Sequence, residues 1–138
     1  MCIFFILSII IFPLSSIRVN ASSSLLPRYN NVFSAQSYAN ISQTGKLTLT
    51  NTYEGKSNYV SKAIITSYIE KQTSNIWIRV NIGTGNNEWI DTIYSQNYTG
   101  NHSTKLSSKG SYRIIVKYVI YGKDQSIDTI TDMLSIQY

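Results

Sequence analysis

The chain has 138 residues, of which 43% are hydrophobic and 14% are charged, and its formal net charge is +5. This length fits one domain, and the apolar content excludes an intrinsically disordered chain. Ser, Thr, Asn, Ile and Tyr are abundant beyond the N-terminal segment, which favours β-strands. The basic residues are scattered rather than clustered, which argues against a nucleic-acid partner. The positive charge fits either simple solubility or weak attraction to anionic surfaces such as teichoic acids and acidic lipid headgroups.

The N-terminus predicts a secretory signal peptide over residues 1–21. Residues 2–14 form an apolar run of about 13 residues, which suits the core of a signal peptide and is too short to span a bilayer. Val19 and Ala21 place small residues before a cleavage site, so we expect cleavage after Ala21 and a secreted, extracellular chain without a stable transmembrane anchor. No Lys or Arg precedes the apolar run, and retention as a short interfacial anchor is the alternative.

Cysteine and histidine usage bears on cofactors. Cys2 is the only cysteine and lies in the predicted leader, so the mature chain would have neither a disulfide nor a cysteine metal site. The absence of disulfides favours a bacterial source. His102 is the only histidine, and a zinc site would then need mostly carboxylate ligands, which is unusual. We predict no metal and no cofactor.

The rest of the chain predicts a flexible arm followed by one antiparallel β-sandwich. Residues 22–39 are polar and irregular, which indicates a flexible N-terminal arm or a weak first strand. Residues 40–138 contain six strand-like segments separated by Gly, Asn and Ser clusters, a pattern typical of a sandwich rather than of alternating strands and helices. The predicted strands are residues 46–53, 59–71, 75–82, 88–94, 111–121 and 126–138.

Alternation within these strands predicts the core-facing side chains. In residues 59–71, the face with Ala63, Ile65 and Ile69 is the expected core face. Residues 111–121 form the strongest predicted strand because every second side chain is uncharged while Arg113 and Lys117 lie on the other face. A short turn follows and leads into the last strand, which predicts a C-terminal hairpin.

The segment KGSYR, residues 109–113, resembles the corner before strand F of immunoglobulin-like domains. In those domains a tyrosine hydroxyl bonds back to the upstream backbone, and Tyr112 would be that tyrosine. Trp77 lies near the position where such domains place their core tryptophan. Over residues 41–138, the order of segments resembles small secreted immunoglobulin-like β-sandwich proteins of Gram-positive bacteria. The resemblance implies a fold and no activity.

No residue pattern predicts an enzyme. His102 has no neighbouring nucleophile in a recognisable motif and is expected to be a solvated loop residue. Asp128 and Asp132 would share one strand face about 13 Å apart, too far for one calcium ion, so we expect surface charges. Glu88 and Asp91 are insufficient evidence for a glycosidase pair. We predict no catalytic residues.

One set of side chains is a candidate ligand-binding site. Trp89, Tyr94, Asn97 and Tyr98 could form a platform on which aromatic rings stack against a sugar while the amide binds its hydroxyl groups. The competing interpretation is that the tyrosines are ordinary strand formers. Trp77 could belong to such a platform or to the core.

The sequence therefore predicts a secreted, non-enzymatic binding or interaction module of unspecified ligand. The candidate partners are an anionic cell-envelope component, a glycan or a protein. The alternative is a small secreted antimicrobial or membrane-active effector, which the positive charge, the alternating strands and the cleavable leader favour.

Overall fold

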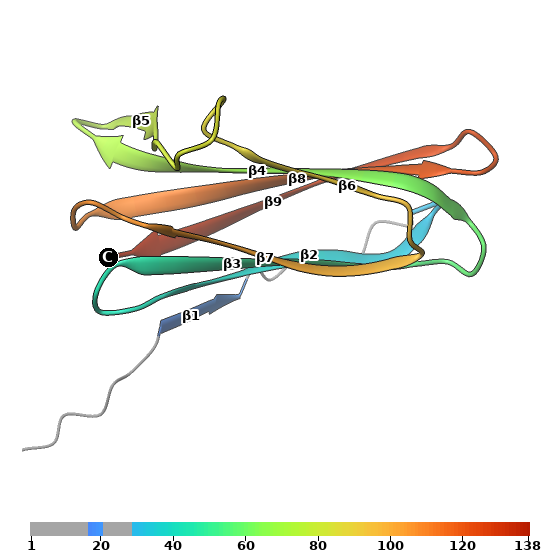
Figure 1. The fold of residues 1–138 in the computed structure, drawn as a ribbon, viewed down its shortest axis with the longest axis horizontal. Coiled ribbons are helices and arrows are strands. Elements are labelled where there is room, and N and C mark those ends of the chain that lie inside the picture. The colour runs from blue at the N-terminus through green and yellow to red at the C-terminus, as the bar shows by residue number, and fades with distance from the viewer. Residues whose placement is uncertain (1–16, 21–28) are drawn as a thin grey trace, which may run out of the picture.

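Two antiparallel sheets pack face to face in the computed structural model, which describes residues 17–20 and 29–138 (Figure 1). All the elements assigned within these ranges are strands, so the predicted all-β sandwich is confirmed. Residues 1–16 and 21–28, which hold most of the predicted signal peptide and part of the predicted arm, lie outside the described residues. Within the described ranges, no helix is long and apolar enough to cross a membrane.

Sheet A has four strands in the order β1-β2-β3-β7, and neighbouring strands run antiparallel. The edge strand β7 pairs with β3, with Lys46 opposite Lys105 at one end and Glu54 opposite Asn97 at the other. The strands are β1 (Ile17–Asn20), β2 (Val32–Ile41), β3 (Lys46–Gly55) and β7 (Asn97–Lys105).

Sheet B has five strands in the order β5-β4-β8-β9, with β6 also paired to β4. The long strand β4 pairs with β8 along one edge, while β5 and β6 occupy different lengths of its other edge. The predicted C-terminal hairpin is present as the antiparallel pair of β8 and β9. The strands are β4 (Val60–Thr73), β5 (Ile76–Arg79), β6 (Trp89–Ile93), β8 (Ser111–Gly122) and β9 (Ile127–Gln137).

The core lies between the sheets and follows the alternation of β4 and β8. The predicted inward side chains of both strands are buried in one hydrophobic cluster with Leu47 and Leu49 of β3. The members from β4 and β8 are Ala63, Ile65, Ile69, Tyr112, Ile114, Val116, Tyr118 and Ile120. Burial of each large apolar side chain contributes about 1.5–3 kcal/mol, so these strands hold the sandwich together.

The structure differs from the sequence prediction at β2. Residues 32–39, which we assigned to a flexible arm with a weak strand as the alternative, form most of β2 and pair with β3. Two of the inward side chains of β2 are the small Ser37 and Ala39, both buried. Because small and polar side chains face the core here, the strand shows little hydrophobic alternation in its sequence.

Strand β7 is not among the strands predicted from the sequence. Its sequence, NYTGNHSTK, has the Gly, Asn, Ser and Thr content of a turn, in keeping with the loop expected around His102. Nevertheless it pairs with β3 along its whole length. The partner strand supplies the hydrophobic core residues, so β7 needs little hydrophobicity of its own.

Tyr112 and Trp77 test two features of the proposed resemblance. The Tyr112 hydroxyl donates a hydrogen bond to the backbone oxygen of Ser108 at 2.5 Å, so the predicted corner bond is confirmed. Of the two possibilities left open for Trp77, the structure excludes the core position, because Trp77 lies in β5 opposite Gln72 and outside the core cluster. Gln72 is on the outward face of β4, which turns Trp77 outward as well.

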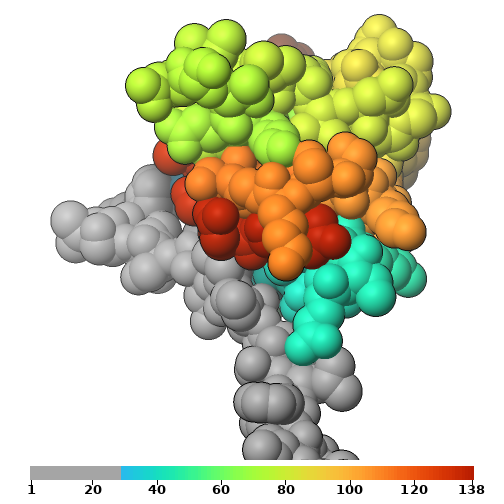
Figure 2. Space-filling model, turned by 90° about the vertical axis from the view of Figure 1, so that its left-hand side faces the viewer, coloured from blue at the N-terminus to red at the C-terminus, as the bar shows by residue number. Residues whose placement is uncertain are grey.

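The turns at one end of the sandwich gather around the C-terminus (Figure 2). The Leu106 amide donates to the Gly45 oxygen at 2.9 Å, and Gly110 and Tyr138 exchange two backbone hydrogen bonds. Gly45 has φ +79°, and a Cβ there would lie 2.8 Å from the ring of Tyr138. Gly45 is therefore required both by its backbone conformation and by the close approach of the ring.

We predict that Gly45→Ala lowers the free energy of unfolding by more than Gly83→Ala. Both glycines have positive φ, but Gly83 has no atom within 4 Å of its would-be Cβ. Gly83→Ala therefore reports only backbone strain, of about 1–3 kcal/mol. Gly45→Ala has the same strain and, in addition, a clash of the new Cβ with the Tyr138 ring. Urea denaturation of both variants measures the difference. Equal losses would show that the Tyr138 ring moves away without cost.

Candidate functional site

The structure separates the four predicted ligand-binding residues. Trp89 in β6 and Tyr98 in β7 pack against the core, whereas Tyr94 between these strands is 76% exposed. Asn97 is exposed at the start of β7, where its Oδ1 accepts a hydrogen bond from the Gly55 amide at 3.1 Å. The two partly buried rings do not form an open stacking surface with Tyr94.

Two of the four residues belong instead to a cluster that bridges the sheets. We call Trp89, Asp91, Tyr98 and His102 the inter-sheet cluster, because β6 belongs to sheet B and β7 to sheet A. His102 Nε2 lies 2.7 Å from Asp91 Oδ2, and the His102 ring stacks on Trp89 with centroids 4.9 Å apart and planes 6° apart. One face of the Trp89 ring is thus occupied by the protein itself.

His102 is not the solvated loop residue that we expected. It lies in β7, opposite Leu49 of the core, and its side chain is only 20% exposed. Its hydrogen-bond partner, Asp91, is on a different sheet. That expectation is therefore wrong, and the cause is the missed strand β7, which turns His102 inward.

Asp91 also acts on Tyr98. Burial raises the pKa of the Tyr98 hydroxyl to about 12, and the charge of Asp91 together with a hydrogen bond to it adds to the increase. Tyr98 therefore keeps its proton at physiological pH and remains a hydrogen-bond donor. The Asp91 carboxylate thus has two polar partners in β7, His102 and Tyr98. These contacts tie β6 to the opposite sheet.

The inter-sheet cluster is suited to holding the two sheets together. Among the described residues, no Ser, Thr or Cys side chain hydrogen-bonds to His102, so a nucleophile–histidine–aspartate arrangement is not formed. The described residues also contain no group of three or more His, Cys, Asp or Glu side chains that could hold a metal ion. No protein family, curated protein or solved structure matches this chain. The chemistry of the site thus rests on its own residues.

We predict that His102→Ala lowers the free energy of unfolding by about 1.5–3 kcal/mol, the range for a hydrogen bond to a charged group. The substitution removes the bond to Asp91 and the stack on Trp89. Ser103→Ala is the matched control, because Ser103 is the next residue of β7 and is exposed. Urea unfolding followed by far-ultraviolet circular dichroism measures both. If the two variants unfold at the same urea concentration, the cluster does not join the sheets.

The other open side of the sandwich is closed by carboxylates of β9. Asp128 is only 5% exposed, and its two oxygens accept hydrogen bonds from the amides of Asn30 and Asn31 at 2.9 and 2.6 Å. Asp132 lies on the same face and is partly buried; burial raises the pKa of its carboxyl. The shared face is as expected, but the expectation of surface charges is wrong, since both side chains point inward.

These environments predict opposite effects for two matched substitutions. Because the pKa of Asp132 is raised by folding, its stabilising contribution is present below the unfolded pKa of about 4 and is lost as the pH rises through the folded value. We therefore expect Asp132→Asn to raise the free energy of unfolding at pH 7 and to flatten its fall between pH 4 and 7. Asp128→Asn should lower the free energy of unfolding by about 1.5–3 kcal/mol, because an amide replaces a charged acceptor. Urea denaturation at both pH values measures this, and a loss of stability in Asp132→Asn at pH 7 would contradict it.

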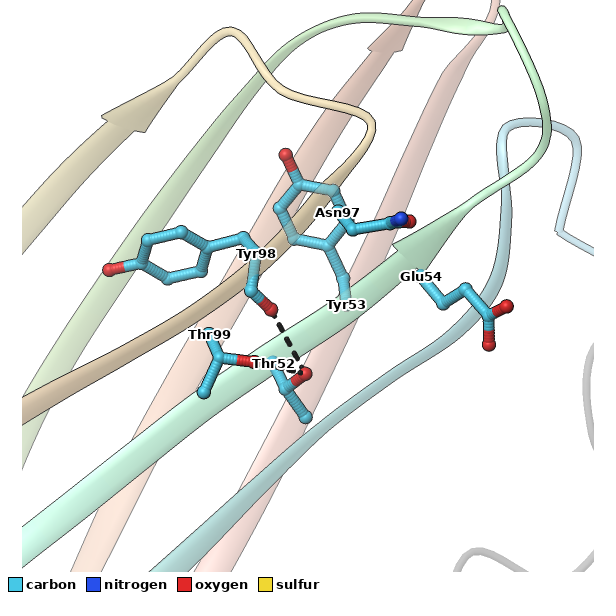
Figure 3. A pocket seen from close by; sticks show the side chains of 6 residues that line it. All are labelled: Thr52, Tyr53, Glu54, Asn97, Tyr98 and Thr99. Carbon is cyan, nitrogen blue, oxygen red and sulfur yellow. Dashed lines mark hydrogen bonds between the residues drawn. The ribbon is translucent and has the colours of Figure 1, made fainter.

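A shallow depression of about 390 Å³ lies where β3 and β7 meet. Figure 3 shows its lining, in which the Thr52 hydroxyl donates to the Tyr98 backbone oxygen at 2.9 Å. The rings of Tyr53 and Tyr98 stack with centroids 6.1 Å apart and are turned toward the core, so the outward lining is polar. The lining residues are Thr52, Tyr53, Glu54, Asn97, Tyr98 and Thr99. The depression is too shallow to enclose a small molecule.

The outward face of sheet B is the more unusual surface. We call the outward side chains of β4, β5, β6, β8 and β9 the outer face of sheet B. Ile90 and Met133 on this face are 55% and 60% exposed. Strand register places Tyr68, Ile115 and Met133 side by side across three strands. The apolar and aromatic members are Ile64, Tyr68, Trp77, Ile90, Ile115, Val119, Tyr121, Ile127 and Met133.

Cations lie over the aromatic rings of this face. The guanidinium groups of Arg79 and Arg113 lie 3.5 Å from the Tyr68 ring centre and 4.5 Å from that of Trp77. Arg113 also pairs with Glu70 at 2.5 Å. Cation–π contacts of this kind are worth about 0.5–1 kcal/mol at exposed sites. These contacts hold both guanidinium groups against aromatic rings of this face.

Lys117 occupies the middle of the face. It is exposed, lies between Thr66 and Thr131 of the neighbouring strands, and has Ile115 and Val119 as its outward neighbours along β8. Among the described residues it forms no ion pair. An exposed cation surrounded by apolar and hydroxyl groups is thus the centre of the surface.

The outer face of sheet A has a different composition. We give this name to the outward side chains of β2, β3 and β7. Their central positions carry no charge and few apolar groups: Gln36, Tyr38, Asn40, Thr48, Thr50, Thr52, Thr99, Asn101 and Ser103. The two outward faces of the sandwich are therefore chemically distinct. This difference depends on strand register, which residue composition alone does not give.

Proposed function

We propose that this protein is a secreted, non-catalytic binding module that engages an anionic partner of the cell envelope through the outer face of sheet B. The observation that carries the proposal is the exposed Lys117 within a surface of apolar and aromatic side chains. Soluble monomeric proteins rarely expose large contiguous apolar patches, and such patches mark sites of interaction.

We also propose that the sandwich is immunoglobulin-like. Its sheets contain β2-β3-β7 on one side and β4-β8-β9 on the other, which corresponds to strands A-B-E and C-F-G of immunoglobulin domains. The bond from Tyr112 to Ser108 corresponds to their tyrosine corner. These features support the resemblance without antibody-type cysteines.

Charge supports an anionic partner. The outer face of sheet B carries Lys62, Arg79, Arg113 and Lys117, while its carboxylates are Glu70 and the Glu88 that pairs with Arg79 at 3.4 Å. Four cations against two carboxylates give this face an excess of positive charge. The whole chain is also positive, at +5, so long-range attraction favours the same partner.

The test is binding to three immobilised anionic probes: deacylated lipoteichoic acid, poly-L-glutamate and phosphatidylglycerol vesicles. We expect binding to at least one probe, and Lys117→Glu should weaken it roughly tenfold, or about 1.4 kcal/mol. Thr48→Glu is the matched control, because it places the same new charge on the outer face of sheet A. Binding should also weaken with added salt.

Two outcomes would overturn this proposal. Absence of binding to all three probes would remove the anionic partner. Equal losses in Lys117→Glu and Thr48→Glu would show that net charge alone, and not the outer face of sheet B, governs binding. Far-ultraviolet circular dichroism of both variants verifies that each retains its strands.

A further inference from the structure

The outer face of sheet B has the composition of a membrane-interface surface. Trp and Tyr are enriched at the headgroup level of bilayers, where one part of the ring is apolar and another is wet. This face carries Trp77, Tyr68 and Tyr121, each with a cationic side chain over its ring. Resting on the proposed function, we infer that the anionic partner is a phospholipid headgroup surface, onto which this face docks while the sandwich stays folded.

The arrangement of the apolar side chains supports an extended partner. Ile90 is near one edge of the sheet in β6, and Met133 is near the other in β9. Both are more than half exposed, and Ile115 and Val119 lie between them in β8. The depression described above lies on sheet A strands. A broad face with its protruding apolar groups at both edges is matched better by a planar surface than by a small ligand.

The cations match phosphate groups. Arg79 and Arg113 are held against rings, and Lys117 stands free among apolar neighbours with a flexible stem. Long basic side chains place their stems against apolar surface and their charges in the headgroup region. Each Lys or Arg near an anionic membrane surface contributes about 1 kcal/mol. Apolar contact and phosphate binding can therefore occur at the same time.

A second copy of this chain is a poorer occupant. Two-fold packing of this face against itself would bring Lys117 of each copy into one desolvated contact, and like charges there are costly. An acidic protein would satisfy the charge but is a different partner, and poly-L-glutamate represents it in the test. Docking differs from membrane disruption: β4 and β8 are paired along their length, and docking of the intact sheet requires no strand to leave it.

The two tryptophans provide the experiment. Trp77 lies on the outer face of sheet B, and Trp89 lies in the inter-sheet cluster against His102. The full chain is mixed with phosphatidylcholine vesicles, with or without an equal amount of phosphatidylglycerol, while tryptophan emission is recorded. We expect a blue shift, and quenching by brominated lipid, only with phosphatidylglycerol. Trp77→Phe should abolish both signals, and Trp89→Phe should retain them.

Substitutions on the face then test its chemistry. Lys117→Gln should weaken vesicle binding roughly fivefold, which corresponds to one basic residue near the surface, and Met133→Asp should also weaken it. Thr48→Glu, on the outer face of sheet A, is the control, and we expect it to retain vesicle binding. Lys117 is exposed and Gln removes the charge while keeping a polar side chain, so Lys117→Gln tests the proposal even if Met133→Asp fails to fold.

The outcomes separate this inference from the proposed function. Binding to deacylated lipoteichoic acid or poly-L-glutamate without binding to vesicles would overturn the lipid inference and leave the anionic-partner proposal standing. Failure with every probe would overturn both. Vesicle binding that leaves Trp77 emission unchanged would place the contact elsewhere and overturn the inference. Release of a trapped dye from the vesicles would also overturn it, in favour of a membrane-active effector.

Discussion

The pairing of β4 with β8 is the constraint on which the rest of the structure depends. These strands lie at the centre of sheet B, and their inward side chains, including Ile65 and Ile114, are fully buried. A slip of one residue would turn the whole apolar set outward and bring the charges of Glu70 and Arg113 into the core. The register is therefore fixed by burial, and the positions of β5, β6 and β9 follow from it.

Polar groups close the two sides that the sheets leave open. On one side, Asp91 and His102 join β6 to β7; on the other, Asp128 binds the backbone at the start of β2. Tyr118 extends across the core to Ser37 at 2.7 Å. Apolar packing tolerates small sliding movements, but hydrogen bonds do not, so these contacts specify how one sheet sits on the other. Inward carboxylates on β9 also discourage pairing of its free edge with another chain.

The sequence predicts the parts of the fold that alternation encodes. The core faces of β4 and β8 were predictable because branched and aromatic side chains recur at every second position. β7 was not, because its burial is supplied by β3. His102 was misassigned for the same reason, since its partner Asp91 is close in sequence but belongs to the other sheet. Trp77 stayed open between core and surface because its orientation follows from the pairing of β5 with the end of β4.

The outward residues raise a different question, because neither sheet needs apolar side chains there in order to fold. Strand propensity explains Ile115 and Val119, since β-branched residues favour strands on either face. It does not explain Met133, which is unbranched and 60% exposed and whose nearest outward neighbours along β9 are Thr131 and Ser135. Sheet A builds its outward face from Thr, Asn and Ser on the same backbone geometry. The apolar surface of sheet B is therefore a feature beyond the requirements of folding, and the proposed contact with a partner would account for it.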